Sequence, residues 1–400
     1  MGSIFSDLQF YKLNKMAIVF TKDISTTKLL MAYNNHFVKF SSDNAKIPLN
    51  CTITGIGVVP IIIYPHPDGS FLFNLCEYVK SDINTNNFSD NLTTDLQSSN
   101  PTSFTYDVSD NCFLNPSVNF KITFTDDTFE TISRTLKFIA GAENLESFKK
   151  NEIIISEANY LVLSPVEDRT NNKTYLKYWE GYPFEFSFYT NFPADQFKLI
   201  NTTNSLNYEF QAKGNVTSLF LSDGRTDVTI EDFLPLALGY NQLRIEHEEV
   251  IQENLITIHK VDTDCGIYLK WLNQYGRWNY WLMSKNHFRN RSTKSLGQLE
   301  NDFENIEDTI SPMIEMGKTS QESIRCIYER MNVNEKRILE GISESPKIYM
   351  FTGERFSRAN ANDWIEVSLK TNTFNITKPS TELYSIQIEI ELPERNTIKL

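Results

Sequence analysis

Residue types that commonly carry catalysis or bind metals are few and scattered in this sequence. The five histidines, at positions 36, 66, 247, 259 and 287, form neither an HExxH motif nor a pair with metal-ligand spacing. His247 lies among glutamates in RIEHEEV, but the period-two geometry of a strand directs it away from its immediate neighbours. The pattern favours a solvated strand face over a zinc site, and we predict no bound metal.

Motifs for nucleotide binding and nucleophilic catalysis are missing as well. The chain contains no GxSxG, Walker loop, GxGxxG or DxDxDG pattern. Its 51 carboxylates offer many pairs for glycoside hydrolysis, but a sequence does not give the distance between two carboxyl groups. We therefore predict that the protein is not an enzyme and needs no cofactor.

The most prominent feature of the sequence is a cluster of aromatic residues. The stretch CGIYLKWLNQYGRWNYWLM, Cys265 to Met283, contains three of the five tryptophans. Residues 273–276 have the composition of a turn between two strands, and Gly276 can adopt the positive φ that such a turn requires. The flanking strands carry large apolar groups on both faces, which indicates a sheet packed between domains or against another subunit. We interpret the stretch as a structural clamp.

Two other interpretations of the aromatic stretch are weaker. A sugar-binding platform exposes its stacking aromatics and would not normally fill both faces of a hairpin. A membrane element needs a longer apolar surface. The longest apolar run, GIGVVPIIIY, is broken by Pro60 and falls short of the about 20 residues that span a bilayer. We predict no transmembrane segment and keep ligand binding as the alternative to the clamp.

A second apolar surface follows the aromatic stretch. In TKSLGQLENDFENIEDTI, Thr293 to Ile310, apolar residues recur at spacings of three and four, which predicts an amphipathic helix. The segments SQESIRCIYERM and NEKRILEGI are predicted to continue the helical part. Hairpin and helix together offer more apolar surface than one small domain needs, so we predict an interface or clamp. Its residues are Tyr268, Trp271, Trp278, Tyr280, Trp281, Leu296, Leu299 and Phe303.

The overall composition and charge exclude further classes of function. The chain has 400 residues, which suits two or three domains. Its net charge of −13 argues against binding nucleic acid along an extended surface, because phosphate neutralisation needs clustered lysine and arginine. The one basic run, KNHFRNRSTK, is interpreted as a solvated loop. Five scattered cysteines without a CxxC motif indicate free buried thiols in a reducing cytosol, and the N-terminus resembles no secretory signal.

The elements that position these residues are mainly strands. Alternating apolar residues, separated by turn formers, predict an Ig-like β-sandwich over residues 16–150, after an N-terminal arm of residues 1–15. A polar connector at 141–152, expected to be helical, leads to a second β domain over residues 151–262. Residues 263–400 are predicted to form a mixed α+β domain with the aromatic hairpin, short helices and C-terminal strands.

Two strand patterns are especially regular. In PFEFSF, three phenylalanines alternate with Glu185 and Ser187, which predicts a half-buried strand. In LYSIQIEIELPE, apolar residues alternate with polar ones over positions 384–392, which predicts a strand with one solvated face. The segment IEDFLPLALGYN is expected to form a short helical turn.

Short blocks along the chain resemble a family of virion proteins. CGIYLKWLNQYGRWNYWLM is similar to a Gly-Tyr-Leu-Arg-Trp-x-Asn-x-x-Gly-x-x-x-Tyr-Trp-Leu-Phe signature of structural proteins from tailed phages that infect Bacteroidota, crAss-like phages included. YPHPDGSFLFNLCEYVKSDI, YWEGYPFEFSF, SESPKIYMF, DWIEVSLK and IQIEIELPE resemble further blocks of that family in the same order. Cys76, Glu77 and Leu272 depart from the family's usual residues. The resemblance implies a role in assembly and no catalytic residues.

We therefore expect a structural component of a tailed-phage virion, located in the tail at the baseplate, hub or collar and made in the cytoplasm of the host bacterium. The expected partners are further copies of the chain in a homo-oligomeric ring and other tail proteins. Sequence-specific binding of nucleic acid is not expected. The alternative is a receptor- or glycan-binding module of the phage tail.

Overall fold

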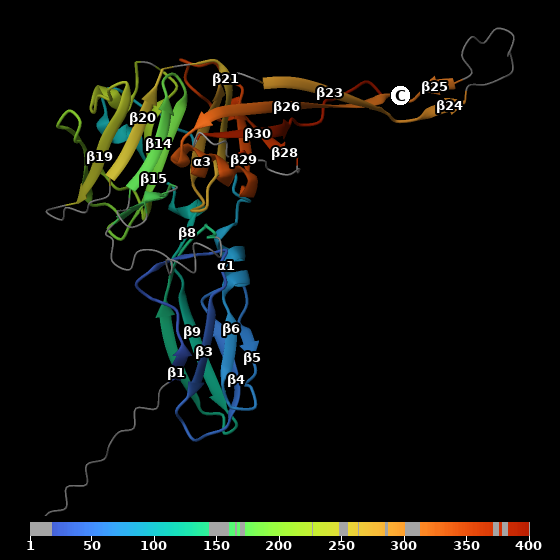
Figure 1. The fold of residues 1–400 in the computed structure, drawn as a ribbon. Coiled ribbons are helices and arrows are strands. Elements are labelled where there is room, and N and C mark those ends of the chain that lie inside the picture. The colour runs from blue at the N-terminus through green and yellow to red at the C-terminus, as the bar shows by residue number, and fades with distance from the viewer. Residues whose placement is uncertain are drawn as a thin grey trace, which may run out of the picture. The chain divides into compact units, whose positions relative to one another are not determined.

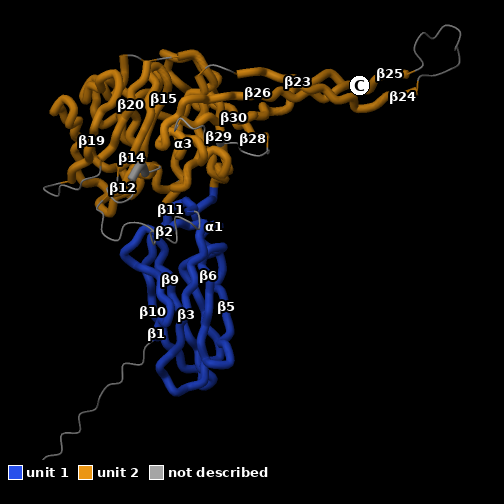
Figure 2. Tube along the Cα trace, in the orientation of Figure 1, with its two compact units in different colours: residues 1–85, 114–157 blue, residues 86–113, 158–400 orange. Residues whose placement is uncertain are grey.

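The mainly β fold class predicted from the sequence is confirmed by a computed structural model of the chain. The chain forms two compact units: unit 1 comprises residues 1–85 and 114–157, and unit 2 comprises residues 86–113 and 158–400 (Figure 2). The predicted domain boundary near residue 262 thus falls inside unit 2. The structure describes residues 18–143, 160–164, 166–168, 173–225, 227–247, 255–262, 264–284, 287–300, 313–370, 376–377 and 383–399.

Unit 1 is an Ig-like β-sandwich (Figure 1). One sheet has the order β1-β3-β6, with β1 (Ile18–Lys22), β3 (Phe37–Ser42) and β6 (Phe71–Asn74). The other has the order β10-β9-β4-β5, with β10 (Phe129–Thr135), β9 (Ser117–Phe124), β4 (Pro48–Thr54) and β5 (Ile61–Ile63). Phe40 stacks on Phe71 at 5.4 Å and meets Phe120 of the other sheet at 5.1 Å, so the aromatic residues of alternating strands form the core.

Two smaller elements complete unit 1. The parallel pair of β2 (Leu29–Met31) and β11 (Lys137–Ile139) is extended by β8 (Phe113–Leu114), within which the division between the units falls. Helix α1 (Cys76–Ile83), which the sequence analysis did not predict, buries Cys76, Val79 and Ile83. The predicted N-terminal arm and most of the predicted helical connector lie outside the described residues.

Unit 2 begins with a second β-sandwich. Its four-stranded sheet has the order β12-β15-β18-β7, with β12 (Tyr160–Val162), β15 (Pro183–Thr190), β18 (Val216–Asp223) and β7 (Thr105–Asp107). Its six-stranded sheet has the order β13-β14-β20-β19-β16-β17, with β13 (Val166–Asp168), β14 (Lys173–Trp179), β20 (Leu255–Val261), β19 (Gly239–His247), β16 (Gln196–Asn201) and β17 (Leu206–Gln211). Phe188 of one sheet meets Phe197 and Phe210 of the other at 5.5 and 5.6 Å.

The C-terminal part of unit 2 is an eight-stranded sheet. Its order is β22-β21-β27-β28-β30-β26-β23, with β29 paired to β30. The strands are β21 (Gly266–Leu272), β22 (Trp278–Ser284), β23 (His287–Ser295), β26 (Lys318–Met331), β27 (Ile348–Phe351), β28 (Trp364–Leu369), β29 (Ile376–Thr377) and β30 (Tyr384–Glu391). β24 (Gln298–Glu300) and β25 (Met313–Glu315) form a separate two-stranded sheet.

Short helices interrupt the strands of unit 2. They are α3 (Val333–Glu340) and the 3₁₀ turns η1 (Pro101–Phe104), η2 (Ser109–Asn111), η3 (Ile230–Asp232), η4 (Gly341–Glu344) and η5 (Ala361–Asp363). The predicted helix in NEKRILEGI corresponds to α3, which begins with a capping box between Asn332 and Glu335. The helical turn predicted in IEDFLPLALGYN is η3. Both predictions are confirmed.

Two helix predictions are wrong. Residues 293–300 form the end of β23 and all of β24, and SQESIRCIYERM lies within β26. The remainder of the first predicted helix, residues 301–310, lies outside the described residues. Strand pairing explains the error: β23 hydrogen-bonds to β26 from His287–Cys326 to Ser295–Lys318, and this non-local ladder overrides a local spacing of three and four.

The regular C-terminal strand prediction is confirmed. In β30 the side chains of Ile386, Ile388 and Ile390 are buried while Gln387 is exposed. All five cysteines are free, as predicted, but Cys265 is exposed whereas the other four are buried.

Candidate functional site

The aromatic stretch forms an antiparallel hairpin closed by a tight turn. β21 pairs with β22 along its whole length. Gly276 has a φ of 70°, and its N–H donates to the carbonyl oxygen of Asn273 at 2.9 Å. The Asn273 side-chain oxygen accepts from the N–H groups of Tyr275 and Arg277, which fixes the turn. The predicted turn, with its glycine at positive φ, is confirmed.

Both faces of this hairpin are covered by unit 2 itself. On one face, Trp281 lies 5.0 Å from Trp179 of β14 and 5.3 Å from Tyr328 of β26. On the other, Tyr268 lies 4.5 Å from Tyr182, which precedes β15. The hairpin therefore packs into the core that the second sandwich shares with the C-terminal sheet.

The residues predicted as one interface fall into two groups. Tyr268, Trp271, Trp278, Tyr280 and Trp281 are all buried, with exposed fractions between 0% and 8%. Leu296 and Leu299, in contrast, are 41% and 52% exposed. Phe303 lies outside the described residues. The structure thus brings the five aromatic residues together and separates the two leucines from them; their role as an interface stays a prediction.

The leucines belong to an extension that we call the ribbon, residues 287–300 and 313–322, along which the C-terminal residues 392–399 are bonded to residues 317–322 (Figure 1). All residues of β23, β24 and β25 are exposed. Within the described structure β23 pairs only with β26, so one of its edges is open. The basic run that was interpreted as a solvated loop is therefore a solvated strand from His287 onward, and that interpretation is corrected.

The ribbon presents apolar and basic groups to solvent. Phe288 is 59% exposed, and β25 contributes Met313 and Ile314 at 39% and 41%. Arg291 is paired with Glu322 of β26 at 2.5 Å, and Arg395 lies 2.7 Å from the same carboxylate. These two guanidinium groups hold the pKa of Glu322 below its usual range through hydrogen bonds and charge.

A buried ion pair joins helix α3 to β14. Lys177 Nζ of β14 lies 2.5 Å from Glu335 Oε1 of α3, and both side chains are less than a tenth exposed. The same Nζ donates to Tyr328 Oη at 3.0 Å and lies 5.1 Å from the centre of the Trp281 ring. Burial lowers the pKa of Lys177, but Tyr328 and Glu335 outweigh that effect and the pKa is raised. Lys177 thus interacts with Glu335, Tyr328 and Trp281, and its role is structural.

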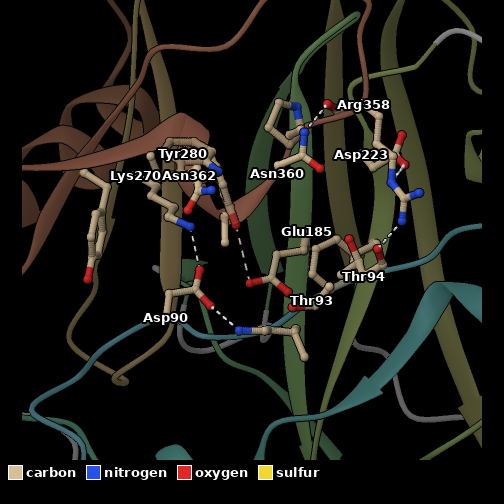
Figure 3. A pocket seen from close by; sticks show the side chains of 17 residues that line it. Asp90, Thr93, Thr94, Glu185, Asp223, Lys270, Tyr280, Arg358, Asn360 and Asn362 are labelled. Atoms are coloured by element: carbon tan, nitrogen blue, oxygen red, sulfur yellow. Dashed lines mark hydrogen bonds and ion pairs between the residues drawn. The ribbon is translucent and has the colours of Figure 1, made fainter.

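A second buried lysine borders a cavity of about 310 Å³ in unit 2 (Figure 3). The cavity lies where β15, β21, β22 and β28 meet residues 90–94 and the loop 358–362. Lys270 Nζ is 2.5 Å from Asp90 Oδ2 and 4.2 Å from the centre of the Trp364 ring. Lys270 is held between the Asp90 carboxylate and the Trp364 ring, so its side chain forms a fixed polar wall of the cavity.

Glu185 contributes a buried carboxylate to the same cavity. Its Oε1 accepts from Arg277 Nη2 at 3.3 Å and from Tyr280 Oη at 3.4 Å. Burial raises the pKa of Glu185, and the charge of Arg277 opposes that shift. The half-buried strand predicted here is wrong, because every residue of β15 is buried. The hairpin residues Arg277 and Tyr280 cover the face that carries Glu185.

The sequence analysis missed these cavity residues, although a signal was present. Lys270 is the only charged residue in GIYLKWL, and Glu185 is the only one in PFEFSFYT. A single charge within an apolar strand is buried together with its neighbours and requires a partner. Such lone charges are better markers of a site than the runs of exposed carboxylates.

His247 also departs from expectation. It is only 3% exposed, stacks between Phe192 and Phe197 at 4.9 and 4.7 Å, and its Nε2 lies 3.0 Å from Asp195 Oδ2. The predicted solvated face is therefore wrong at this position: the ring is part of the core. Among the described residues, no group of three or more histidine, cysteine, aspartate or glutamate side chains is arranged to hold a metal ion. Of the helices described, none has the length and apolar character to cross a membrane.

Comparison with known proteins gives only distant likenesses. No protein-family model and no curated protein matches the chain. A tetra-tandem repeat from the extending region of a large adhesion protein is 10% identical with a TM-score of 0.22, and the match covers 80% of this chain and 61% of that one. The Dpr2 Ig1-Ig2 complex with DIP-Theta Ig1-Ig3 is 7% identical with a TM-score of 0.22, covering 95% and 90%. At such values neither likeness indicates what the chain does.

Proposed function

We propose that this protein is a structural component of a tailed-phage virion, located in the tail, and that neighbouring copies associate through the ribbon. The observation that carries the proposal is the ribbon itself. The C-terminal residues 392–399 bond the outer edge of β26, but the edge of β23 is open within the described structure. An open strand edge is a template for pairing with another chain. The ribbon is therefore a surface that association would complete.

The chemistry of the ribbon supports a neighbouring copy as its partner. Arg289 and Lys294 on β23 form no ion pair within the described part of the chain, whereas the chain as a whole carries a net charge of −13. A basic strand on an acidic protein complements other surfaces of the same protein. Phe288 and Leu299 add apolar area, and pairing along the β23 edge would supply main-chain hydrogen bonds.

The buried aromatic hairpin supports a passive role. The second sandwich and the C-terminal sheet of unit 2 share one core, so the base of the ribbon is held by a rigid body. The resemblance of the hairpin sequence to phage structural proteins supports a virion as the place of assembly. A ring of copies in contact through the ribbon would bury more than about 1,000 Å² per contact.

The test combines purified virions with a ribbon deletion. In the deletion variant an Asn-Gly turn replaces residues 291–322. This turn connects Asn290 to Ser323, its partner in the β23–β26 ladder. We expect the intact protein to be present in purified particles in many copies, as judged by mass spectrometry. We expect the deletion variant to fold but to be excluded from particles when it is supplied in place of the intact protein.

A matched pair of point variants controls for general surface effects. Phe288 on the ribbon is 59% exposed and Phe129 in unit 1 is 58% exposed. Phe288→Ala should reduce incorporation into particles, whereas Phe129→Ala should not. Absence of the protein from virions, or full incorporation of the deletion variant, would contradict the proposal.

A further inference from the structure

Lys270 and Asp90 form a buried contact between two side chains that can react with one another. Lys270 Nζ on β21 lies 2.5 Å from Asp90 Oδ2, and the two side chains are 5% and 20% exposed. Both residues line the same cavity of unit 2 (Figure 3). An amine and a carboxyl group together contain every atom of an amide bond and of one water molecule. Their condensation therefore needs no other reactant.

The amine is held in one position by aromatic rings. Lys270 Nζ lies 4.2 Å from the centre of the Trp364 ring and 5.2 Å from that of the Trp278 ring. The centre of the Tyr349 ring lies 5.4 Å away, so three rings surround the nitrogen. Because Oδ2 is bonded to Cγ, the amine lies next to the carbon atom that it would attack. Reactants held in contact in one arrangement react far faster than free ones.

The carboxyl group of Asp90 is fixed at both of its oxygens. Oδ2 faces Lys270, while Oδ1 accepts a hydrogen bond from the backbone N–H of Leu92 at 3.3 Å. Attack of an amine on Cγ places negative charge on one carboxyl oxygen, and a backbone N–H that already bonds that oxygen stabilises the charge. The geometry thus suits Oδ1 for the developing charge and Oδ2 for the departing water.

Glu185 adds a second carboxyl group to the same cavity. Burial raises the pKa of Glu185, the charge of Arg277 opposes that shift, and the charge of Asp90 adds to it. Two carboxylates that repel one another in a buried place favour a state in which one of them carries a proton. The ammonium group of Lys270 is a source of that proton, and its loss leaves the neutral amine that attack requires.

We propose that Lys270 and Asp90 form an intramolecular isopeptide bond. The ammonium group of Lys270 first gives a proton to Asp90 Oδ2 across their contact. The neutral Nζ then attacks Cγ, the C–N bond forms, and Oδ1 takes the negative charge. A second proton passes from the nitrogen to the Oδ2 hydroxyl, and the Cγ–Oδ2 bond breaks as Oδ1 forms the amide carbonyl. The water that leaves enters the adjoining cavity.

The bond fastens one segment of unit 2 to the core of that unit. Residues 86–113 belong to unit 2, although the residues before and after them belong to unit 1. Asp90 lies in this segment, and Lys270 lies 180 positions further along the chain. A covalent bond between them restricts the unfolded chain, as a disulfide does. The inference goes beyond the proposed assembly role and does not rest on it, because no ribbon residue lines the cavity.

The intact mass of the purified full-length protein tests the inference. We expect a mass lower than that of the sequence by one water molecule. After trypsin digestion we expect the peptides around Asp90 and Lys270 to be joined, with no cleavage after Lys270. Lys270→Arg keeps a cation beside Asp90 but removes the nucleophilic amine, so this variant should have the full mass of its sequence.

Lys177→Arg is the matched control, because Lys177 Nζ also lies 2.5 Å from a buried carboxylate, that of Glu335. It should keep the loss of one water and the joined peptides, and circular dichroism checks that both variants fold. An unsubstituted protein with the full mass of its sequence would overturn the inference without any variant. Loss of water in Lys270→Arg would overturn it as well. So would loss of water with cleavage after Lys270, because it would show a succinimide at Asp90 instead.

Discussion

The aromatic hairpin and the ribbon are both pairs of antiparallel strands in the same sheet, yet their environments are opposite. Trp271 and Trp281 of the hairpin are completely buried, whereas every residue of β23 is exposed. The hairpin strands β21 and β22 carry large side chains on both faces, and both faces are covered. The ribbon carries mixed polar and apolar residues; the C-terminal residues 392–399 bond its β26 strand, whereas the side chains of β23, β24 and β25 are all exposed.

The two regions therefore contribute differently to the stability of unit 2. The hairpin contributes to the stability of unit 2 because its aromatic surface is removed from water within one chain. The ribbon contributes little to that stability because its side chains stay in solvent. The sequence analysis assigned both regions to one interface. The structure places the hairpin in the core, and of the two regions only the ribbon is exposed.

The largest expected effect is the removal of a hairpin tryptophan. Trp281→Ala should lower the free energy of unfolding by about 3–5 kcal/mol, because it leaves a large cavity in the core. Phe288→Ala on the ribbon should change it by less than about 0.5 kcal/mol. Urea denaturation measures both. Similar losses in the two variants would show that the ribbon is part of the folding unit.

The ion pairs of the two regions provide the next comparison. Lys177–Glu335 beneath the hairpin and Arg291–Glu322 at the ribbon have the same N–O distance of 2.5 Å. Lys177→Met should cost about 3–5 kcal/mol, since it leaves Glu335 buried without its cation. Arg291→Met should cost much less, because Arg291 is 56% exposed to water and Glu322 keeps Arg395 as a partner.

A double variant distinguishes charge from packing in that comparison. Replacing Lys177 with Met and Glu335 with Leu together should recover most of the stability that the single Lys177→Met variant loses. If the double variant is as unstable as the single one, the contribution of the pair lies in packing against Trp281 and Tyr328, and the charge account is wrong.

The smallest predicted effect is a difference in pH dependence. The pKa of Glu185 is raised above its ordinary 4.5 by burial, so its contribution to stability is present below pH 4.5 and is lost as the pH rises through the folded value. The pKa of Glu322 is lowered by Arg291 and Arg395, so its contribution is present above pH 4.5 and is lost as the pH falls through the folded value.

Glutamine variants test the two opposite directions of pH dependence. Relative to the unmodified protein, Glu185→Gln should gain stability as the pH rises above 4.5, and Glu322→Gln should gain stability as the pH falls below it. Urea midpoints between about pH 3 and pH 7 measure both differences. The same sign in both variants would refute the assigned electrostatic environments.

Sequence patterns predicted the parts of the fold in which side-chain alternation is local. The alternation of Ile386, Ile388 and Ile390 gave the terminal strand correctly, and Gly276 marked the turn of the hairpin. The ribbon was missed because the apolar spacing around Leu296 and Leu299 fits a helix, whereas strand pairing with residues far along the chain decides its conformation. Local spacing contains no information about such a partner.

The cavity could not be predicted for a related reason. Asp90, Glu185 and Lys270 come from three distant segments, and only the packing of the hairpin on the second sandwich brings them together. Single charges within GIYLKWL and PFEFSFYT indicate that buried partners exist. They do not indicate which residues those partners are.

The most direct test of the central claim is a density map of virions that contain this protein, at a resolution that traces strands. We predict that the open edge of β23 is paired with, or covered by, a neighbouring copy and that Phe288 is buried in that contact. We also predict that Trp271 and Trp281 remain within the core of their own chain. A map in which residues 287–300 face solvent in every copy would contradict the assignment of the ribbon as the assembly surface.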